Sequence, residues 1–398
     1  MSDLDVVSFE DETAASGSTR VKWGVLLCKR CSVWYPIYTH APVLLTFETN
    51  LHRAFFERFR TRIEPLGAYS APRGKPQPGE ESVQRSFTEE WDTVQESELS
   101  FLYSDGDLKA LNERVWLSWL KKTDAPIRRV LNVGAGLGRE ALALQKLLPE
   151  AEIFAIDLNL AVIRAAERLR EVQGLQIVVA SLFKLPFKRR SFDLVYSQGV
   201  IHHTYSTRAA LESISTRVAP GGYLFIWVYG LDDHLVRRGA AGAATRALYA
   251  FEGVARPAIA AMPAWPRRMF FGALTMLAHP LVKSRVSNKA SWRFANTNHD
   301  LRDWLSPRYA HRHSYNELFE WFAHLGFEVI DVQSPAEYRR LFNRRLWGVG
   351  LTGRLPETFA PSCTDAAPYP AASARNARRD ENASPSPDRI APPQRSAV

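Results

Sequence analysis

A glycine-rich segment between an apolar run and a helical run is the feature that most constrains this chain. It reads Arg129-Val130-Leu131-Asn132-Val133-Gly134-Ala135-Gly136-Leu137-Gly138-Arg139-Glu140. Glycine has no Cβ and adopts positive φ, so a ligand can lie directly against the backbone of such a turn. The helix predicted to follow, over 139–148, presents unpaired amides to that ligand. The segment therefore predicts a strand, a ligand-binding turn and a helix in direct succession.

The spacing of these glycines separates two classes of ligand. The pattern is G-x-G-x-G, whereas dinucleotide-binding domains carry G-x-G-x-x-G, and Arg139 stands where their third glycine would be. An NAD(P)-dependent oxidoreductase on a similar sheet therefore remains an alternative, but the spacing disfavours it.

Composition excludes several other classes. The 398 residues suffice for one large or two modest domains, with 46% hydrophobic and 23% charged residues. The net charge of +9 comes without a Lys/Arg block interleaved with aromatics, so we expect no nucleic-acid partner. Three cysteines cannot build a disulfide framework, and the N-terminus is too acidic for a targeting signal. No apolar run approaches the roughly 18 residues of a membrane span, so we expect a cytoplasmic protein.

Shifts in composition predict a domain layout. We expect a disordered N-terminus, a small ribbon-like segment, a Pro/Gly-rich linker, a catalytic core interrupted by a helical cap insertion, and a disordered tail. The N-terminus is 1–20, the ribbon-like segment 21–70 and the linker 71–85. The core is 86–230 and 311–355, the insertion between its two parts is 231–310, and the tail is 356–398.

Within the core, helical and strand-like runs alternate. Such alternation predicts a doubly wound α/β fold whose sheet is mostly parallel and binds its ligand beyond the carboxyl ends of the strands. The insertion, in contrast, contains broken helical runs and no strands. The expected core strands are 129–133, 152–156, 176–179, 192–196, 222–229, 327–333 and 346–355, and the expected helices are 107–121, 139–148, 159–172, 206–218 and 314–325. In the ribbon-like segment, Trp23–Leu27 and Val43–Phe47 are also expected as β-strands.

Polar residues follow the predicted strands in a consistent order. Asp157 ends the second strand, 19 residues beyond Gly138, where a carboxylate can accept from two ribose hydroxyls. Ser181 and Leu182 follow the third strand, and Ser197 closes the fourth, just before His202 and His203. A Pro220-Gly221-Gly222 turn leads into the fifth strand.

Taken together, these motifs resemble class I S-adenosylmethionine-dependent methyltransferases, in particular the small-molecule branch of ubiquinone- and menaquinone-biosynthesis type. The resemblance implies a Rossmann-like sheet of seven strands with the last one antiparallel, and S-adenosyl-L-methionine as cofactor. It also implies that the glycines meet the methionine moiety, Asp157 the ribose and Ser181-Leu182 the adenine. Asn132 and Ser181 depart from the family, which usually has acidic residues there. The cofactor-binding residues expected from it are Asn132, Gly134, Ala135, Gly136, Gly138, Asp157, Leu158, Ser181, Leu182 and Ser197.

The acceptor side is less specific. His203 is the candidate general base and His202 a candidate pocket residue, but for either one a structural role is the favoured alternative. Tyr309 and His311 lie in an Asp-Trp-x-Ser-Pro-x-Tyr-x-His segment (303–311) that resembles an active-site wall of related enzymes. Phe87 and Trp91 are candidates for a lid over the cofactor, or for ordinary core contacts of one helix.

Two further segments invite functional interpretations. Apolar helical runs flanked by basic residues at 256–285 are typical of a cap that buries its apolar face, or of peripheral contact with a membrane surface and a lipophilic acceptor. Cys28-Lys29-Arg30-Cys31 has the spacing of a zinc knuckle, but no second C-x-x-C follows. We therefore interpret it as a degenerate zinc-ribbon-like segment without metal. A catalytically inactive methyltransferase-fold scaffold is the remaining alternative function.

Overall fold

The computed structural model describes residues 4–13, 17, 19–92, 103–123, 125–231, 239–285, 292–343 and 345–358. Contacts divide the chain into two units, Met1–Glu357 and Thr358–Val398, and all the described helices and strands belong to the first. The predicted disordered tail lies outside the described residues from position 359 onward.

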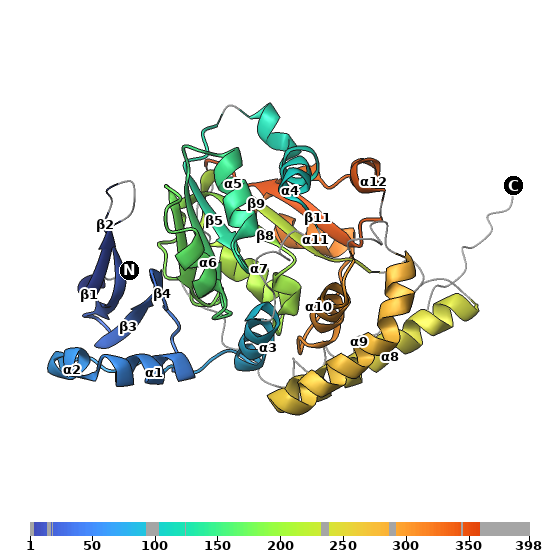
Figure 1. Ribbon diagram of the computed structural model, residues 1–398. Coiled ribbons are helices and arrows are strands. Elements are labelled where there is room, and N and C mark those ends of the chain that lie inside the picture. The colour runs from blue at the N-terminus through green and yellow to red at the C-terminus, as the bar shows by residue number, and fades with distance from the viewer. Residues whose placement is uncertain are drawn as a thin grey trace, which may run out of the picture. The chain divides into compact units, whose positions relative to one another are not determined.

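A seven-stranded sheet forms the centre of the fold (Figure 1). Its strand order is β10-β11-β9-β8-β5-β6-β7. Neighbouring strands from β9 to β7 run parallel, while β11 is antiparallel to both β9 and β10. The predicted doubly wound, mostly parallel sheet with an antiparallel last strand is thus confirmed. The strands are β5 (Arg129–Val133), β6 (Glu152–Asp157), β7 (Leu175–Val179), β8 (Phe192–Gln198), β9 (Val218–Tyr229), β10 (Glu328–Val332) and β11 (Gly348–Arg354).

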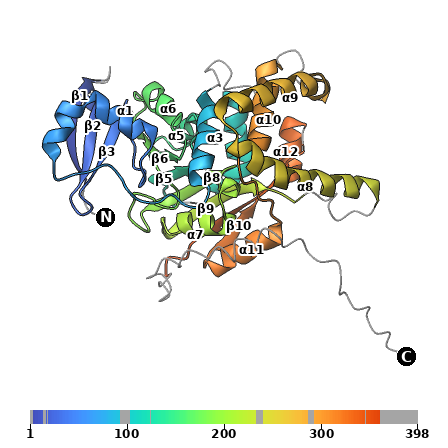
Figure 2. The same cartoon turned by 90° about the horizontal axis from the view of Figure 1, so that it is seen from below.

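Helices cover both faces of this sheet, which explains why its central strands are apolar almost throughout. Seen from below, α5 and α6 lie on one side of the sheet and α7 and α11 on the other (Figure 2). These helices are α5 (Arg139–Leu147), α6 (Val162–Arg168), α7 (Thr207–Ser215) and α11 (Tyr315–His324). Buried side chains of β5, β8 and β9, such as Val130, Leu194 and Phe225, form the core between the layers.

Several parts of the core differ from the predicted helices, and α6 covers only part of the expected helix 159–172. The expected helix 107–121 consists of α4 (Asp105–Leu111), a π-helical turn (Asn112–Trp116) and a 3-10 turn (Ser118–Lys122). Val115 and Trp116 of the π-helical turn and Trp119 of the 3-10 turn are buried in the core. A short helix that we did not predict, α12 (Pro335–Phe342), connects β10 to β11.

The N-terminal residues form a second sheet, so the prediction of disorder over 1–20 is wrong for the described part. β1 (Leu4–Thr13) pairs antiparallel with β2 (Thr19–Cys28), and β3 (Val33–Tyr38) and β4 (Ala41–Pro42) complete the order β1-β2-β3-β4. The acidic composition that suggested disorder is balanced across the strands, because Lys22 Nζ lies 3.0 Å from a Glu12 carboxylate oxygen. Phe9 also packs against the aromatic core of this sheet.

The two sheets meet at an edge. Leu44 donates a backbone hydrogen bond of 2.8 Å to the Val179 carbonyl at the end of β7, and Val43 forms a parallel bridge with Val179. This contact covers part of the β7 edge, which would otherwise expose unpaired backbone groups. The predicted strand over Val43–Phe47 is correspondingly reduced to this bridge after β4. Two short helices, α1 (Asn50–Arg58) and α2 (Arg60–Ile63), follow.

The cysteine pair lies at the turn between β2 and β3. Cys28 is buried at the end of β2, Cys31 is exposed, and neither forms a disulfide. Within the described ranges no group of three or more His, Cys, Asp or Glu side chains is placed to hold a metal ion. The ribbon-like description of this segment stays a prediction.

The predicted linker is shorter than expected. It ends at Gly79, because α3 (Glu80–Asp92) begins six residues before the predicted start of the core. The Glu80 carboxylate accepts a 2.8 Å hydrogen bond from the Gln77 amide, which satisfies a donor at the start of this helix. The sequence predicts a longer linker because prolines and glycines are frequent between positions 71 and 79.

In the described part of the insertion there are three helices: α8 (Ala240–Ala261), α9 (Ala264–Arg285) and α10 (Phe294–Leu305). The absence of strands agrees with the prediction over the described part, but α8 and α9 are continuous through Pro257 and Pro280 and not broken there. α8 and α9 both pack on α10 through Ile259, Phe271 and Leu301. None of the helices in the described ranges is long and apolar enough to cross a membrane.

The core packing generates a first prediction. Phe225 on β9 is fully buried and stacks on Tyr196 with ring centroids 4.8 Å apart. We expect Phe225→Ala to lower the free energy of unfolding by about 3–5 kcal/mol, because it leaves a cavity in a close-packed layer. Chemical denaturation measures this loss. Phe251→Ala removes an exposed ring on α8 and should change stability by no more than about 0.5 kcal/mol; equal losses would contradict the packing of β9.

Candidate active site

The glycine turn joins β5 to α5 and is fixed against the neighbouring strand. The amides of Gly134 and Ala135 both donate to the Ile156 carbonyl, at 2.8 and 2.9 Å. Gly134 has φ of +85°, and a Cβ there would lie 2.0 Å from a Val200 methyl group, so no other residue fits. Gly138 adopts the left-handed conformation at the N-cap of α5.

Asp157 lies directly beside this turn. One carboxylate oxygen accepts a 2.7 Å hydrogen bond from the Gly136 amide, and the other accepts a 2.9 Å bond from the Asn159 amide. Burial raises the pKa of this carboxyl, while the backbone donors at Asn159 and Gly136 oppose the rise. Each oxygen keeps a further lone pair, so Asp157 can still accept from a ligand.

A cavity of about 430 Å³ opens at this edge of the sheet. It is bounded by the turn and the ends of β6 and β8, by α3, and by residues of α10. Both aromatic and charged side chains line it. The lining side chains and backbone include Glu80, Phe87, Trp91, Gly134, Ala135, Gly136, Arg139, Glu140, Asp157, Leu158, Leu182, Phe183, Gln198, His203, Tyr205, Trp227, Tyr229, His299, Asp300 and Asp303.

Six of the ten expected cofactor residues line this cavity: Gly134, Ala135, Gly136, Asp157, Leu158 and Leu182. The other four lie behind its wall. Asn132 and Ser197 are fully buried in adjacent strands, and their side-chain polar atoms find no hydrogen-bond partner among the described residues. Gly138 caps α5, and the Ser181 hydroxyl accepts from the Phe183 amide at 3.1 Å.

Glu140 is a cavity residue that sequence reasoning missed. It occupies the first turn of α5, and burial raises the pKa of its carboxyl to about 8. With its amide nitrogen turned toward this group, Gln198 donates to a Glu140 oxygen at 3.1 Å. The position just after the glycine turn could have pointed to it, because helix N-termini face the ligand.

The opposite end of the cavity carries hydroxyl, carboxylate and imidazole groups. The Tyr229 hydroxyl donates to an Asp303 carboxylate oxygen at 2.9 Å. His203 Nδ1 lies 2.8 Å from the Tyr309 carbonyl oxygen, which can only accept, so Nδ1 carries the hydrogen and Nε2 the lone pair. Burial lowers the pKa of His203 to about 4, and the imidazole is therefore neutral near pH 7.

The other predicted pocket residues lie behind His203 and do not line the cavity. His202 is buried and packs against Tyr229 with the two rings tilted and their centroids 3.9 Å apart. His311 donates from its backbone amide to the His202 carbonyl, and its Nε2 lies 2.9 Å from the Thr204 carbonyl. Tyr309 contributes the carbonyl that orients His203. This segment therefore supports the imidazole from outside.

α3 and α10 close the cavity over the glycine turn. The Trp91 ring lies in contact with Gly136, where a Cβ would meet it at 3.4 Å, and against His299 of α10 at a centroid distance of 5.1 Å. Phe87 meets the His203 ring edge-on at 5.3 Å. The two residues predicted as a lid or as core contacts thus lie over the cavity, one at each end.

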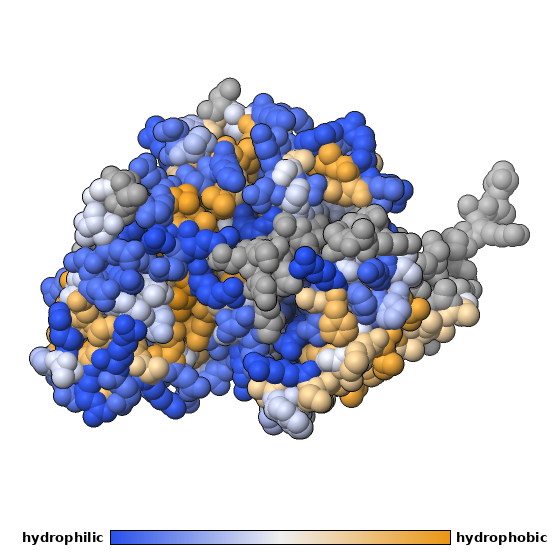
Figure 3. Space-filling model, in the orientation of Figure 1, coloured by the Kyte–Doolittle hydropathy of each residue, from blue (hydrophilic) through white to orange (hydrophobic). Residues whose placement is uncertain are grey.

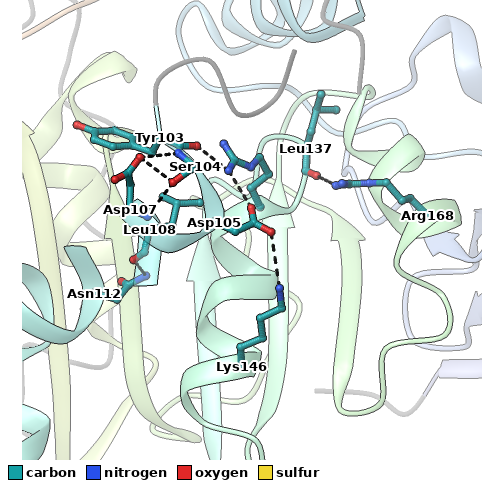
Figure 4. A network of polar contacts seen from close by, with 10 residues as sticks. Tyr103, Ser104, Asp105, Asp107, Leu108, Asn112, Leu137, Lys146 and Arg168 are labelled. Carbon is teal, nitrogen blue, oxygen red and sulfur yellow. Dashed lines mark hydrogen bonds and ion pairs between the residues drawn. The ribbon is translucent and has the colours of Figure 1, made fainter. Parts of the chain in front are cut away.

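A polar network fixes the other side of the turn (Figure 4). Arg139 donates to the Tyr103 carbonyl at 2.7 Å and to Asp105 at 3.0 Å, and Arg168 donates to the Leu137 carbonyl. The Asp105 carboxylate also lies 3.7 Å from Lys146. These contacts bind the start of α4 to α5 and hold Tyr103 at the cavity wall.

Comparisons with known proteins identify this part of the chain. Residues 131–226 match the family described as a methyltransferase domain. That range contains the glycine turn, Asp157 and His203. The chain thus carries a class I methyltransferase domain, whose cofactor is S-adenosylmethionine.

Individual relatives share the same segment. An uncharacterized methyltransferase of Schizosaccharomyces pombe is 32% identical over 117 residues, which cover 27% of this chain and 41% of that protein. A malonyl-[acyl-carrier protein] O-methyltransferase of Legionella pneumophila is 32% identical over 109 residues, covering 26% of this chain and 37% of that protein. The chain thus spans less than half of these relatives.

Among solved structures, a 1,6-didemethyltoxoflavin-N1-methyltransferase of Burkholderia thailandensis, with its substrate and S-adenosylhomocysteine bound, is similar at 16% identity. The alignment covers 72% of this chain and 93% of that one, with a TM-score of 0.40.

The half-buried Glu140 generates a prediction about pH. Its folded pKa of about 8 exceeds the ordinary 4.5, so the folded protein retains a proton that the unfolded chain loses. This carboxyl therefore makes stability fall as pH rises from about 5 to about 8, by at most about 1.4 kcal/mol per pH unit. We expect Glu140→Gln to remove this contribution, so that its unfolding free energy exceeds that of the wild type increasingly toward pH 8. Denaturation across that range measures the difference. Glu150→Gln, at an exposed site, should follow the wild-type profile, and an unchanged profile for Glu140→Gln would contradict the burial.

Proposed function

We propose that this protein transfers a methyl group from S-adenosylmethionine to a small lipophilic acceptor by in-line displacement. The observation that carries the proposal is a single cavity that joins a nucleoside-binding end, at the glycine turn and Asp157, to an end with a neutral imidazole, at His203. Methyl transfer requires a cofactor and an acceptor in one line, and such a continuous cavity suits that requirement.

The residues at the turn fit the cofactor. The backbone of Gly134, Ala135 and Gly136 lines the cavity and would meet its amino-acid part beneath Trp91. Asp157 would accept from the ribose hydroxyls with its remaining lone pairs, and Leu158 and Leu182 would enclose the adenine. Gly138, Ser181, Asn132 and Ser197 would support these groups from behind. When bound, the cofactor supplies an electrophilic methyl group on a positively charged sulfur.

Glu140 is our candidate for the carboxylate that meets the cofactor's ammonium group. The residue expected for that role, Asn132, carries no charge and is buried away from the cavity. Glu140 lies in the cavity wall beside the turn, and an ammonium group would offset the desolvation that raises its pKa. Glu140, on the helix α5 after the turn, would thus supply the negative charge that Asn132 lacks.

His203 is the proposed base for an acceptor that must lose a proton. The Tyr309 carbonyl orients its ring so that Nε2 holds the lone pair, and the low pKa keeps the ring unprotonated at neutral pH. His202, Tyr309 and His311 would hold this imidazole in position. A pKa of about 4 limits proton abstraction to acceptors that become acidic as their bond to the methyl group forms.

The cavity walls suggest the class of acceptor. Phe87, Trp91, Trp227 and Tyr205 give it aromatic sides, and Asp303 with Tyr229 provides a polar pair for a hydroxyl or amine. We therefore propose an aromatic or lipid-like acceptor, in keeping with the ubiquinone- and menaquinone-type branch that the motifs resemble. We further propose a cytoplasmic location, no nucleic-acid partner and peripheral membrane contact through residues 256–285.

Calorimetry distinguishes this function from its alternatives. We expect the full chain to bind S-adenosylhomocysteine and not NADPH. Binding of NADPH alone would favour an oxidoreductase, and binding of neither would favour an inactive scaffold.

Asp157 provides the sharpest test of the cofactor site. We expect Asp157→Ala to weaken S-adenosylhomocysteine binding by about a hundredfold or more, because two charge-assisted hydrogen bonds of about 1.5–3 kcal/mol each are lost. Asp157→Asn keeps one acceptor oxygen and should lose less. Glu152→Ala, at the other end of β6, is the matched control and should leave the dissociation constant unchanged. A wild-type constant for Asp157→Ala would refute the placement of the ribose.

His203 tests the acceptor end. We expect His203→Ala to lower the single-turnover rate of methyl transfer by about a hundredfold or more with the cofactor constant unchanged, since general-base catalysis contributes about 10²–10⁴-fold. Single-turnover assays with radiolabelled cofactor and a quinone-precursor phenol measure that rate. A control, His324→Ala, changes a histidine at the end of α11. If His203→Ala keeps the wild-type rate, the imidazole is structural.

A further inference from the structure

The insertion presents an unusual apolar surface to solvent. On α8, Leu248, Phe251 and Val254 are exposed, Val254 by 75%. On α9 the exposed residues are Trp265, Met269, Met276, Leu277 and Leu281, with Trp265 at 73% and Leu277 at 77%. These eight side chains are here called the outer face. In Figure 3 apolar residues gather along the part of the surface where Figure 1 places α8 and α9.

The spacing of these residues makes the surface continuous along each helix. Positions 248, 251 and 254 repeat every three residues, and 265 and 269, like 277 and 281, are four apart. Residues at such spacings share one side of a helix. Large exposed apolar patches on soluble proteins mark interaction sites, so the outer face is a candidate binding surface.

Charge indicates which partner. Between Ala240 and Arg285 the sequence has a single acidic residue, Glu252, and it is buried. Two of the basic residues, Arg246 and Arg268, are exposed on these same helices. An apolar surface whose helices expose arginines and bury their one acidic residue is complementary to an anionic bilayer, where apolar side chains enter the interface and arginines meet the headgroups. Trp265 is of the type enriched at that depth.

The buried side of the same helices supports the cavity wall. Glu252 accepts from Trp304 Nε1 at 2.8 Å and from Arg312 at 2.8 Å, and Arg267 lies 2.5 Å from a Glu89 carboxylate oxygen of α3. Ile259 and Phe271 pack on α10, which carries His299 and Asp303 into the cavity. A surface resting on α8 and α9 would therefore adjoin the acceptor end.

We propose that the outer face of α8 and α9 docks this protein on an anionic lipid bilayer. This docking surface extends the membrane contact expected at 256–285 toward the start of α8, as far as Leu248. The docking deepens the proposed function by giving a lipophilic acceptor a source next to the cavity, but the docking surface itself does not depend on methyl transfer.

Flotation with vesicles tests the docking. We expect the full chain to float with phosphatidylcholine–phosphatidylglycerol vesicles and much less with phosphatidylcholine alone. The variant Phe251→Gln/Trp265→Gln/Leu277→Gln should bind the anionic vesicles less well by about tenfold or more for each apolar side chain replaced. Trp347→Gln is the matched control, because Trp347 is 65% exposed outside the insertion and should bind as the wild type does.

A second variant tests the charges separately. Arg246→Gln/Arg268→Gln should weaken binding to the anionic vesicles by about fivefold for each arginine, and added salt should remove this difference. S-adenosylhomocysteine calorimetry on every variant shows that the fold is kept and reports on the proposed function independently. Wild-type protein that binds S-adenosylhomocysteine but does not float would overturn the docking. Flotation that neither variant weakens would also overturn the docking. So would a dimer in solution that the apolar variant dissociates, because the outer face would then pair two copies of the chain.

Discussion

The contact between the glycine turn after β5 and the end of β6 is the constraint on which the rest of the site depends. Gly134 and Ala135 donate to the Ile156 carbonyl, and Gly136 donates to the Asp157 carboxylate. These bonds place bare backbone and a carboxylate side by side at the switch point of the sheet. Because the Gly134 Cβ position is filled by Val200, the turn also fixes the loop after β8, which carries His203. One local geometry thus orders both ends of the cavity.

Much of the sheet could be predicted from local sequence, because its strands are buried on both sides. Strand β5 matches its predicted bounds, and the apolar runs around Phe154 and Val195 leave little doubt about β6 and β8. The N-terminal strands were harder. The stretch before Thr13 is polar and acidic, but as a strand it forms an ion pair from Glu12 to Lys22 and packs Phe9 on an aromatic core. Such cross-strand partners are invisible to a local pattern.

The candidate site also combines residues that local sequence predicts with residues that only tertiary packing brings together. Glycines and Asp157 follow from strand ends, whereas His299 and Asp303 come from α10, distant in sequence, and only tertiary packing brings them to the cavity. Tyr309 and His311 were expected to face the acceptor, yet their segment contacts His203 from behind, through the Tyr309 carbonyl. Composition can indicate that aromatic and titratable residues cluster, but it cannot tell which side of a loop faces a cavity. Only side-chain placement resolves that difference.

The insertion has to satisfy two opposite demands. Its inner side buries charges, among them Arg267, Glu252 and Arg256, and buried charges stay folded only when partners compensate their desolvation. Such partners are specific, so they fix the position of α10 and of the cavity wall it forms. The outer face has no such pairing and consists of apolar side chains that water solvates poorly. Because buried charges and their partners fix the position of α8 and α9, these helices can expose apolar residues without repacking to bury them. A specific inner side is therefore what makes an apolar docking surface tolerable in water.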